Sequence, residues 1–193
     1  RNLKKLLDIQ EEDNYLYSWP ELGTAKPGEK TLTRLKADVR SVTDNFPTST
    51  IMKNLNRQPG SPFYDDWGIG QVKVGSDTWY PHLHPLSEAD SIQIIEEYPW
   101  PDMTDPSRVA SVSEQARKLA SNKEYAVLGV PWLLFPLERA FALQGMDRFL
   151  TNLVIRQDFA IALLRVITNL CITLMEKFLD EAGPYLDIIK IGD

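Results

Sequence analysis

We predict an α/β fold in which helices connect parallel strands. Two compact apolar runs, residues 125–130 and 186–191, have the composition of strands buried in a parallel sheet. Between them, from about residue 158 to residue 182, apolar side chains recur at helical spacing and form one stripe. The stripe consists of Phe159, Ala162, Leu163, Val166, Ile167, Leu170, Leu174 and Phe178. Strand, helix and strand in this order are typical of β/α units, and we expect the stripe to pack on the sheet.

The first third of the chain predicts short elements. Leu3, Leu6 and Leu7 favour a short helix near the N-terminus, and one or two helical turns are expected over residues 31–35. Residues 37–42 then predict a short strand, in which Val39 and Val42 are the apolar β-branched residues.

Residues 43–106 look like an elaboration inserted between early strands. Residues 71–74 and 78–80 are rich in β-branched and aromatic side chains and flank Gly75-Ser76-Asp77, which is typical of a β-hairpin. Residues 98–102 alternate proline with aromatic residues, so we expect a rigid, extended segment.

The second half predicts regular helices. Asp105 and Pro106 have the pattern of an N-cap followed by the first helical position. Helices are expected over 138–144 and 146–154, with Gly145 between them. We expect the long helix to end at Gly183 in a left-handed conformation, with Pro184 preventing its continuation.

Composition excludes several classes of protein. Apolar residues make up 43% of the chain and charged residues 25%, as in globular domains rather than disordered segments. The net charge of −6, without a basic cluster, disfavours nucleic acid and anionic membranes as partners. We find no apolar run near the roughly 20 residues of a membrane-spanning helix. The one cysteine fits a reducing compartment, so we expect a cytoplasmic protein.

Two carboxylates and two histidines are the first candidates for chemistry. Asp65 and Asp66 could hold a cation or act as acid and base, but such pairs also cap turns. His82 and His84 would face one side of a strand and could bind a metal with a carboxylate. A third ligand is not evident, and a loop beside Pro81 and Pro85 is the plainer interpretation of the histidines.

Two further positions have both a functional and a structural interpretation. Cys171 lies within the long helix beside Leu170 and has no basic neighbour, so a packed thiol is favoured over a nucleophile. Glu138 and Arg139 follow a buried strand, where sites form at the carboxyl edge of a sheet. A surface ion pair on the helix is the favoured alternative for that pair.

A set of short motifs occurs in one order along the chain. They are Asp65-Asp66-Trp67-Gly68-Ile69, His84-Pro85-Leu86, Tyr98-Pro99-Trp100-Pro101-Asp102, Asp105-Pro106, Glu138-Arg139-Ala140-Phe141-Ala142-Leu143-Gln144-Gly145 and Ile191-Gly192-Asp193. Together they resemble the uroporphyrinogen decarboxylase superfamily over roughly residues 35–193. The resemblance is closest to the decarboxylase-like proteins that group with corrinoid-dependent methyltransferases.

The resemblance implies a segment of a (β/α)8 TIM barrel with an inserted β-hairpin, lacking the first strand and the C-terminal half. Residues 1–193 would then form one partial barrel domain. We expect the chain to be part of a longer protein, and we expect a homo-oligomer because an unclosed barrel leaves strand edges unpaired.

Three functions follow from the resemblance. In the methyltransferase branch, zinc bound by a His-x-Cys pair and a distant Cys activates methyl transfer, with a corrinoid protein as partner. Those ligands belong to the absent half, so we expect no cofactor in this segment and zinc only in the full-length protein. The alternative is cofactor-free decarboxylation of uroporphyrinogen III, although its Arg-Gln-Ala-Gly-Arg motif is absent. The third possibility is a non-catalytic folding fragment.

The resemblance also implies which residues contact a small-molecule substrate. We expect Asp66, Trp67, Glu138, Phe141 and Gly192 to bind it. Asp193 is the candidate catalytic residue, since it directly follows a strand and begins the family's pocket segment. Its expected role is to orient the substrate or hold a catalytic group, and the alternative is a cap on the strand end.

Overall fold

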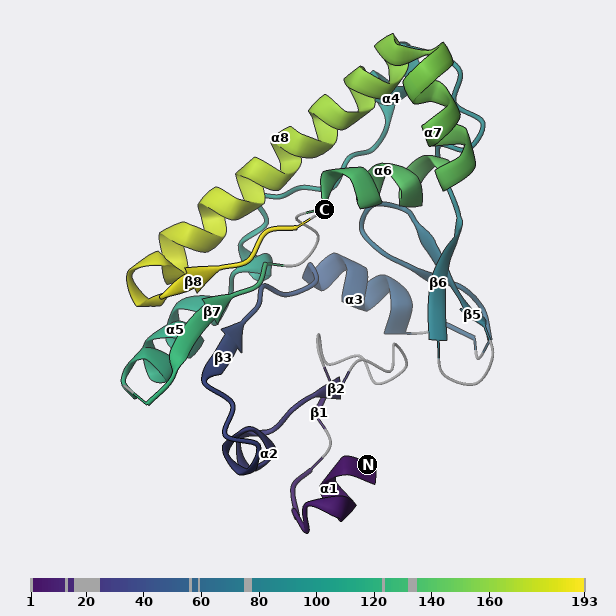
Figure 1. Ribbon diagram of the computed structural model, residues 1–193. Coiled ribbons are helices and arrows are strands. Elements are labelled where there is room, and N and C mark those ends of the chain that lie inside the picture. Colours follow the sequence, from purple (N-terminus) through teal and green to yellow (C-terminus); the bar gives the residue numbers. More distant parts are fainter. Residues whose placement is uncertain are drawn as a thin grey trace.

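The structure is a computed structural model that describes residues 2–12, 14–15, 25–55, 57–58, 60–74, 78–122, 124–131 and 135–192. The fold is mixed α/β: a parallel sheet and two antiparallel sheets are combined with helices of very different length (Figure 1). The α/β prediction is therefore confirmed at this level.

The parallel sheet consists of β3 (Val39–Val42), β7 (Ala126–Gly129) and β8 (Ile188–Ile189) in the order β3-β7-β8. Each strand lies next to the strand that follows it in this sheet along the chain, and both pairings are parallel. The predicted strands at 37–42, 125–130 and 186–191 are thus confirmed as parallel neighbours.

Helices cover one face of this sheet. Val42 and Val127 point to that face and are buried in a cluster with α5 (Val112–Ala120) and the end of α8 (Gln157–Ala182). On the opposite face, Val39 and Leu128 are exposed or half-buried. The expectation that residues 125–130 form a buried strand therefore holds for one face only in the described part of the fold.

The last strand departs most from expectation. Ile188 and Ile189 are 48% and 37% exposed, so β8 is a short edge strand and not a buried one. It is held by backbone bonds to β7 and by the Asp187 carboxylate, which accepts a hydrogen bond from the Val127 N–H at 2.8 Å.

Among the described residues, three α-helices lie between β7 and β8. They are α6 (Pro136–Gln144), α7 (Met146–Ile155) and α8, which confirms the predicted helices. Gly145 separates the first two with a φ of +87°. Gly183 has right-handed helical angles, so the predicted left-handed cap is wrong. Instead the chain tightens into η4 (Gly183–Tyr185), where Pro184 ends the regular helix.

The apolar stripe of α8 packs mainly on other helices. From Phe159 to Leu174 its buried residues belong to a core cluster with α4 (Ile92–Glu97), α6 and α7. Only Phe178 and Ala182 join the cluster that covers the parallel sheet. The prediction that the whole stripe packs on the sheet is corrected accordingly: the helix is longer than the sheet it crosses (Figure 1).

By length and composition alone, residues 157–185 could cross a membrane, contrary to the expectation that no such run exists. Core helices of soluble proteins meet the same criterion, and one third of the most apolar window is buried within this fold.

The connection from β3 to β7 contains the predicted hairpin. Its regular elements are α3 (Thr48–Leu55), β4 (Phe63–Tyr64), β5 (Gly70–Val74), β6 (Thr78–Leu83), α4, η3 (Pro106–Arg108) and α5. Strands β5 and β6 pair antiparallel, whereas the turn at 75–77 lies outside the described residues. The hairpin joins α6 through the Leu86 N–H, which donates to the Leu143 carbonyl at 2.8 Å.

Asp105 caps a shorter helix than expected. Its carboxylate accepts a hydrogen bond from the Ser107 N–H at 2.9 Å, which confirms the predicted N-cap. The helix that follows is the single 3₁₀ turn η3, and α5 begins at Val112 after Ser111 adopts a φ of +69°.

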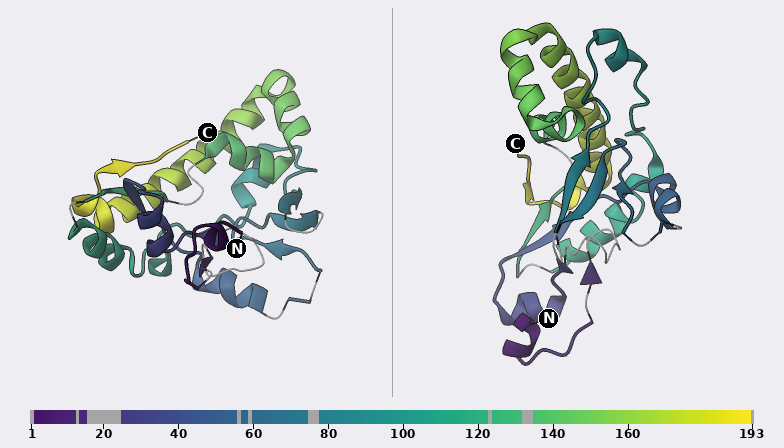
Figure 2. Two further views of the ribbon diagram at one scale, coloured as in Figure 1. Left: turned by 60° about the horizontal axis from the view of Figure 1, so that its bottom comes forward. Right: turned by 90° about the vertical axis from the view of Figure 1, so that its right-hand side faces the viewer.

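The N-terminal region lies far from the helices α6–α8 (Figures 1 and 2). It contains α1 (Asn2–Leu6), β1 (Asn14–Tyr15), β2 (Ala25–Lys26) and α2 (Glu29–Arg34), with the two predicted short helices confirmed. An ion pair between Glu29 and Arg40, at 2.8 Å, ties α2 to β3.

Candidate functional site

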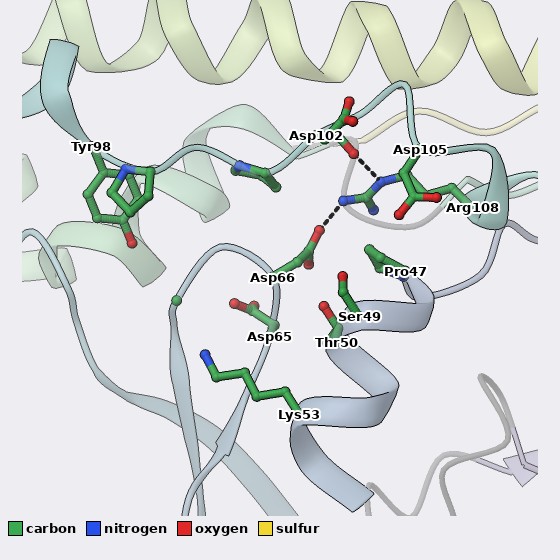
Figure 3. Close-up of a pocket in the computed structure, with 13 residues that line it drawn as sticks. Pro47, Ser49, Thr50, Lys53, Asp65, Asp66, Tyr98, Asp102, Asp105 and Arg108 are labelled. Carbon is green, nitrogen blue, oxygen red and sulfur yellow. Dashed lines mark hydrogen bonds and ion pairs between the residues drawn. The ribbon is translucent and has the colours of Figure 1, made fainter.

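A pocket of about 350 Å³ lies beyond the carboxyl end of β3 (Figure 3). Three segments form it: the start of α3, the turn that precedes β5, and the proline-rich stretch that leads to η3. The lining residues are Pro47, Ser49, Thr50, Lys53, Asp65, Asp66, Gly68, Tyr98, Pro99, Pro101, Asp102, Asp105 and Arg108. The backbone of Asn45 donates to the Arg108 carbonyl at 2.7 Å and so joins the loop after β3 to η3.

Asp65 organises the turn at the base of the pocket. Its Oδ1 accepts hydrogen bonds from the N–H groups of Trp67, at 3.0 Å, and of Ile69, at 2.9 Å. Gly68 provides the φ of +74° that lets the chain reverse. The turn-capping interpretation of the aspartate pair is thus confirmed for Asp65, and the side chain of Asp66 stays directed at the pocket.

Each aspartate is paired with a buried arginine from a distant segment. Nη1 of Arg139, on α6, lies 3.2 Å from Oδ2 of Asp65, and both side chains are at most 10% exposed. Arg108, in η3, forms a short ion pair with Asp66 and also donates from Nε to the Asp102 carbonyl at 2.8 Å. Arg139 is therefore buried, and the expectation of a surface ion pair on the helix is wrong for this residue.

Burial changes the acidity of Asp65. Loss of water around the carboxyl, reinforced by the neighbouring charge of Asp66, raises the pKa of Asp65 to about 6. The charge of Arg139 and the two backbone N–H groups oppose this shift but do not cancel it. Asp65 is thus a carboxyl that changes its charge just below neutral pH.

Aromatic side chains hold the turn from behind. The Tyr98 hydroxyl donates to the Trp67 carbonyl at 2.6 Å, and desolvation raises the pKa of Tyr98 to about 12. Trp67 packs edge-on against Trp100, with ring centroids 6.2 Å apart, and the guanidinium of Arg139 lies 5.2 Å from the Trp67 ring. These contacts leave the turn little freedom to change shape.

The residues predicted to bind substrate do not all lie in the pocket. Asp66 lines the pocket, whereas Trp67 is buried behind it. Glu138 is exposed on α6, and Phe141 packs edge-on against Phe149 at 5.8 Å. None of the last three lines the pocket.

Gly192, which was also predicted to bind substrate, does not line the pocket. A Cβ on Gly192 would lie 2.5 Å from Cε1 of Phe135, so this glycine passes close to the residue that precedes α6. Asp193, the predicted catalytic residue, lies outside the described residues.

The sequence analysis did not single out Arg108 as a site residue, and it placed Arg139 in a surface ion pair. Arg108 follows Asp105 and Pro106 in a segment read only as a helix start, and no local pattern distinguishes it from a surface residue. Its partner Asp66 lies 42 residues earlier, and the partner of Arg139 lies 74 residues earlier. Such pairs become visible only when the chain is folded.

The described residues add no further ligand to a metal site at His82 and His84. His82 is exposed on β6, and Nδ1 of His84 lies 2.8 Å from the Ala142 carbonyl, where it helps join the hairpin to α6. Among the described residues, no group of three or more His, Cys, Asp or Glu side chains could hold a metal ion. Cys171 is buried in the helical core, in keeping with a packed thiol.

Comparison with protein families, with curated proteins and with solved structures finds no match to this chain.

Proposed function

We propose that this chain is part of a (β/α)8-barrel enzyme of the uroporphyrinogen decarboxylase superfamily that binds a small-molecule substrate at the carboxyl edge of its parallel sheet. The observation that carries the proposal is the strand order. β3, β7 and β8 are neighbours in chain order, and both α5 and α8 cover the same face. Consecutive β/α units of a barrel have this arrangement, with neighbouring strands in chain order and their helices on one face.

The position of the pocket supports the same proposal. In barrels, substrates bind to the loops that follow the strands. The pocket is lined by Pro47 and the first turn of α3, which follow β3, and by the Asp65-Asp66 turn. Among the described residues, Val39 and Leu128 on this sheet face are exposed or half-buried, as residues of a barrel interior would be before the remaining strands close it.

Methyl transfer with a corrinoid protein, in the cytoplasm, is the chemistry that the motif resemblance favours. In this proposal Asp66 binds and orients the substrate, and the ion pair with Arg108 holds that carboxylate in place. Asp65 and Arg139 hold the turn from beneath. Any zinc would be held by residues outside this chain.

The experiment uses the complete protein that contains this chain. It is incubated with methylated donors and cob(I)alamin, and methylcobalamin is followed by its absorbance. Decarboxylation of uroporphyrinogen III is measured in parallel by chromatography of the oxidised porphyrins. We expect methylcobalamin only, and we expect Asp66→Asn to slow its formation at least tenfold, while Asp180→Asn, on the exposed side of α8, leaves it unchanged.

Other results would change the proposed chemistry or refute the proposal. Porphyrin decarboxylation without methyl transfer would establish the alternative chemistry. Neither activity in a folded complete protein would leave only the non-catalytic interpretation.

A further inference from the structure

Asp66 has one carboxylate oxygen without a partner. Its side chain is 7% exposed, and Oδ2 is engaged by Arg108. Oδ1 is buried and accepts no hydrogen bond from the described residues. A buried ionised oxygen left in this state is unfavourable, so the site is built to receive a hydrogen-bond donor.

That oxygen belongs to a group that lines the pocket. Figure 3 shows Asp66 in the middle of the pocket, with Arg108 above it and Ser49 and Thr50 of α3 to its right. A volume of about 350 Å³ far exceeds the roughly 30 Å³ that one water molecule occupies. It falls at the lower end of the range for small-molecule sites. The missing donor therefore has room to belong to a small organic molecule.

The charged groups around the pocket determine whether a cationic, neutral or anionic hydrogen-bond donor is favoured. Arg108 balances Asp66, and Arg139 balances Asp65 from behind. The remaining charged groups that line the pocket are Asp102 and Asp105, against Lys53. The pocket thus keeps an excess of negative charge, which favours a cation over a neutral molecule or an anion.

The walls suit a short alkyl group. Pro47, Pro99 and Pro101 give rigid apolar surfaces, and Tyr98 adds an aromatic side chain whose hydroxyl is already engaged by Trp67. Aromatic faces attract ammonium groups as well as alkyl chains.

We infer that this pocket binds a small organic amine in its protonated form, with the ammonium N–H donating to Oδ1 of Asp66. This inference names a substrate class for the proposed function, and it rests on that function only in treating the pocket as the substrate site. Its test measures binding without turnover, so its failure and the failure of methyl transfer are distinguishable.

The probes are n-propylammonium, n-propanol and propionate, which share their chain length and differ in charge. Each is titrated at constant ionic strength into the ¹⁵N-labelled complete protein that contains this chain, and amide chemical shifts are recorded. We expect saturable shifts around Asp66, Gly68 and Tyr98 with n-propylammonium. The apparent affinity for n-propanol and for propionate should be at least tenfold lower.

Variants locate the binding group. Asp66→Asn removes the charge with little change in shape and should weaken n-propylammonium binding at least tenfold. Asp180→Asn, exposed on α8, is the matched control and should leave it unchanged. If Asp66→Asn does not fold, the comparison of the three probes on the unaltered chain decides the question.

Four results would overturn the inference. They are equal or tighter binding of propionate, equal binding of n-propanol, a stronger response of the same amides to Mg²⁺, and the absence of any saturable shift. The last result would mean that water alone fills the pocket.

Discussion

Replacing Arg139 by methionine tests the buried pair beneath the pocket through its pH dependence. Methionine keeps most of the apolar stem but leaves Asp65 without its cationic partner, which lies 3.2 Å away. In the intact chain the pKa of Asp65 is about 6. Without the guanidinium this pKa rises further, so the variant folds with a proton on Asp65 at pH values where the wild type has released it.

The size of the effect follows from these pKa values. One pKa unit corresponds to about 1.4 kcal/mol of free energy. Because Asp65 can take up a proton in the variant, the loss of unfolding free energy cannot exceed the cost of that protonation. At pH 7, one unit above the wild-type pKa, the additional loss of unfolding free energy is at most about 1.4 kcal/mol. At pH 8 it is at most about 2.7 kcal/mol, and well below pH 6 it vanishes. Loss of the contact with Trp67 adds about 0.5–1 kcal/mol at every pH.

The sign of the effect is fixed by proton binding. A carboxyl whose folded-state pKa is raised contributes stability that is present at low pH and lost as the pH rises through that pKa. For the wild type this loss is complete near pH 6, and for Arg139→Met it continues above pH 6. The variant must therefore become progressively less stable than the wild type between pH 6 and pH 8.

Urea unfolding at pH 5, 7 and 8, followed by tryptophan fluorescence and circular dichroism, measures this difference. Arg165→Met, exposed on α8, is the matched control and should show no such dependence. In an Asp65→Asn background the effect of Arg139→Met should also lose its pH dependence. A loss of stability that is the same at all three pH values would refute the assigned role of Asp65.

Three further predictions concern the turn, the helical core and the sheet. Gly68→Ala should cost at least about 1 kcal/mol more than Gly60→Ala in urea unfolding. Both glycines have positive φ, but only at Gly68 would a Cβ lie 2.7 Å from the Tyr98 hydroxyl, so equal costs would contradict that contact. Leu163→Ala should cost about 2–5 kcal/mol and Ile161→Ala, on the exposed side of α8, less than about 0.5 kcal/mol, and a reversed order would mean that the helix is rotated. The open sheet should make the isolated chain self-associate, and a monomer at high concentration in sedimentation velocity would argue against this.

The elements that the sequence predicted well are those with local causes. Helices α6, α7 and α8 follow from apolar periodicity and from Gly145, and the hairpin follows from β-branched runs around a glycine turn. The three parallel strands follow from their composition. Each of these patterns spans a few residues, so neighbouring side chains contain the necessary information.

The errors concern surfaces and long-range pairs. Ile188 and Ile189 are as apolar as any buried strand, and their exposure depends on which elements lie beside them. Gly183 could take a left-handed conformation, but the 3₁₀ turn formed with Pro184 keeps it right-handed. The candidate site depends on Arg108 and Arg139 reaching carboxylates 42 and 74 residues away, which no local pattern encodes.

The length of α8 makes it a mechanical link between the two hydrophobic clusters. Its 26 residues form a continuous rod of about 39 Å. Phe159 to Leu174 anchor the rod in the helical core, and Phe178 and Ala182 anchor it on the parallel sheet. Neither cluster can come apart without bending or detaching this rod. The two cores should consequently melt in a single cooperative step.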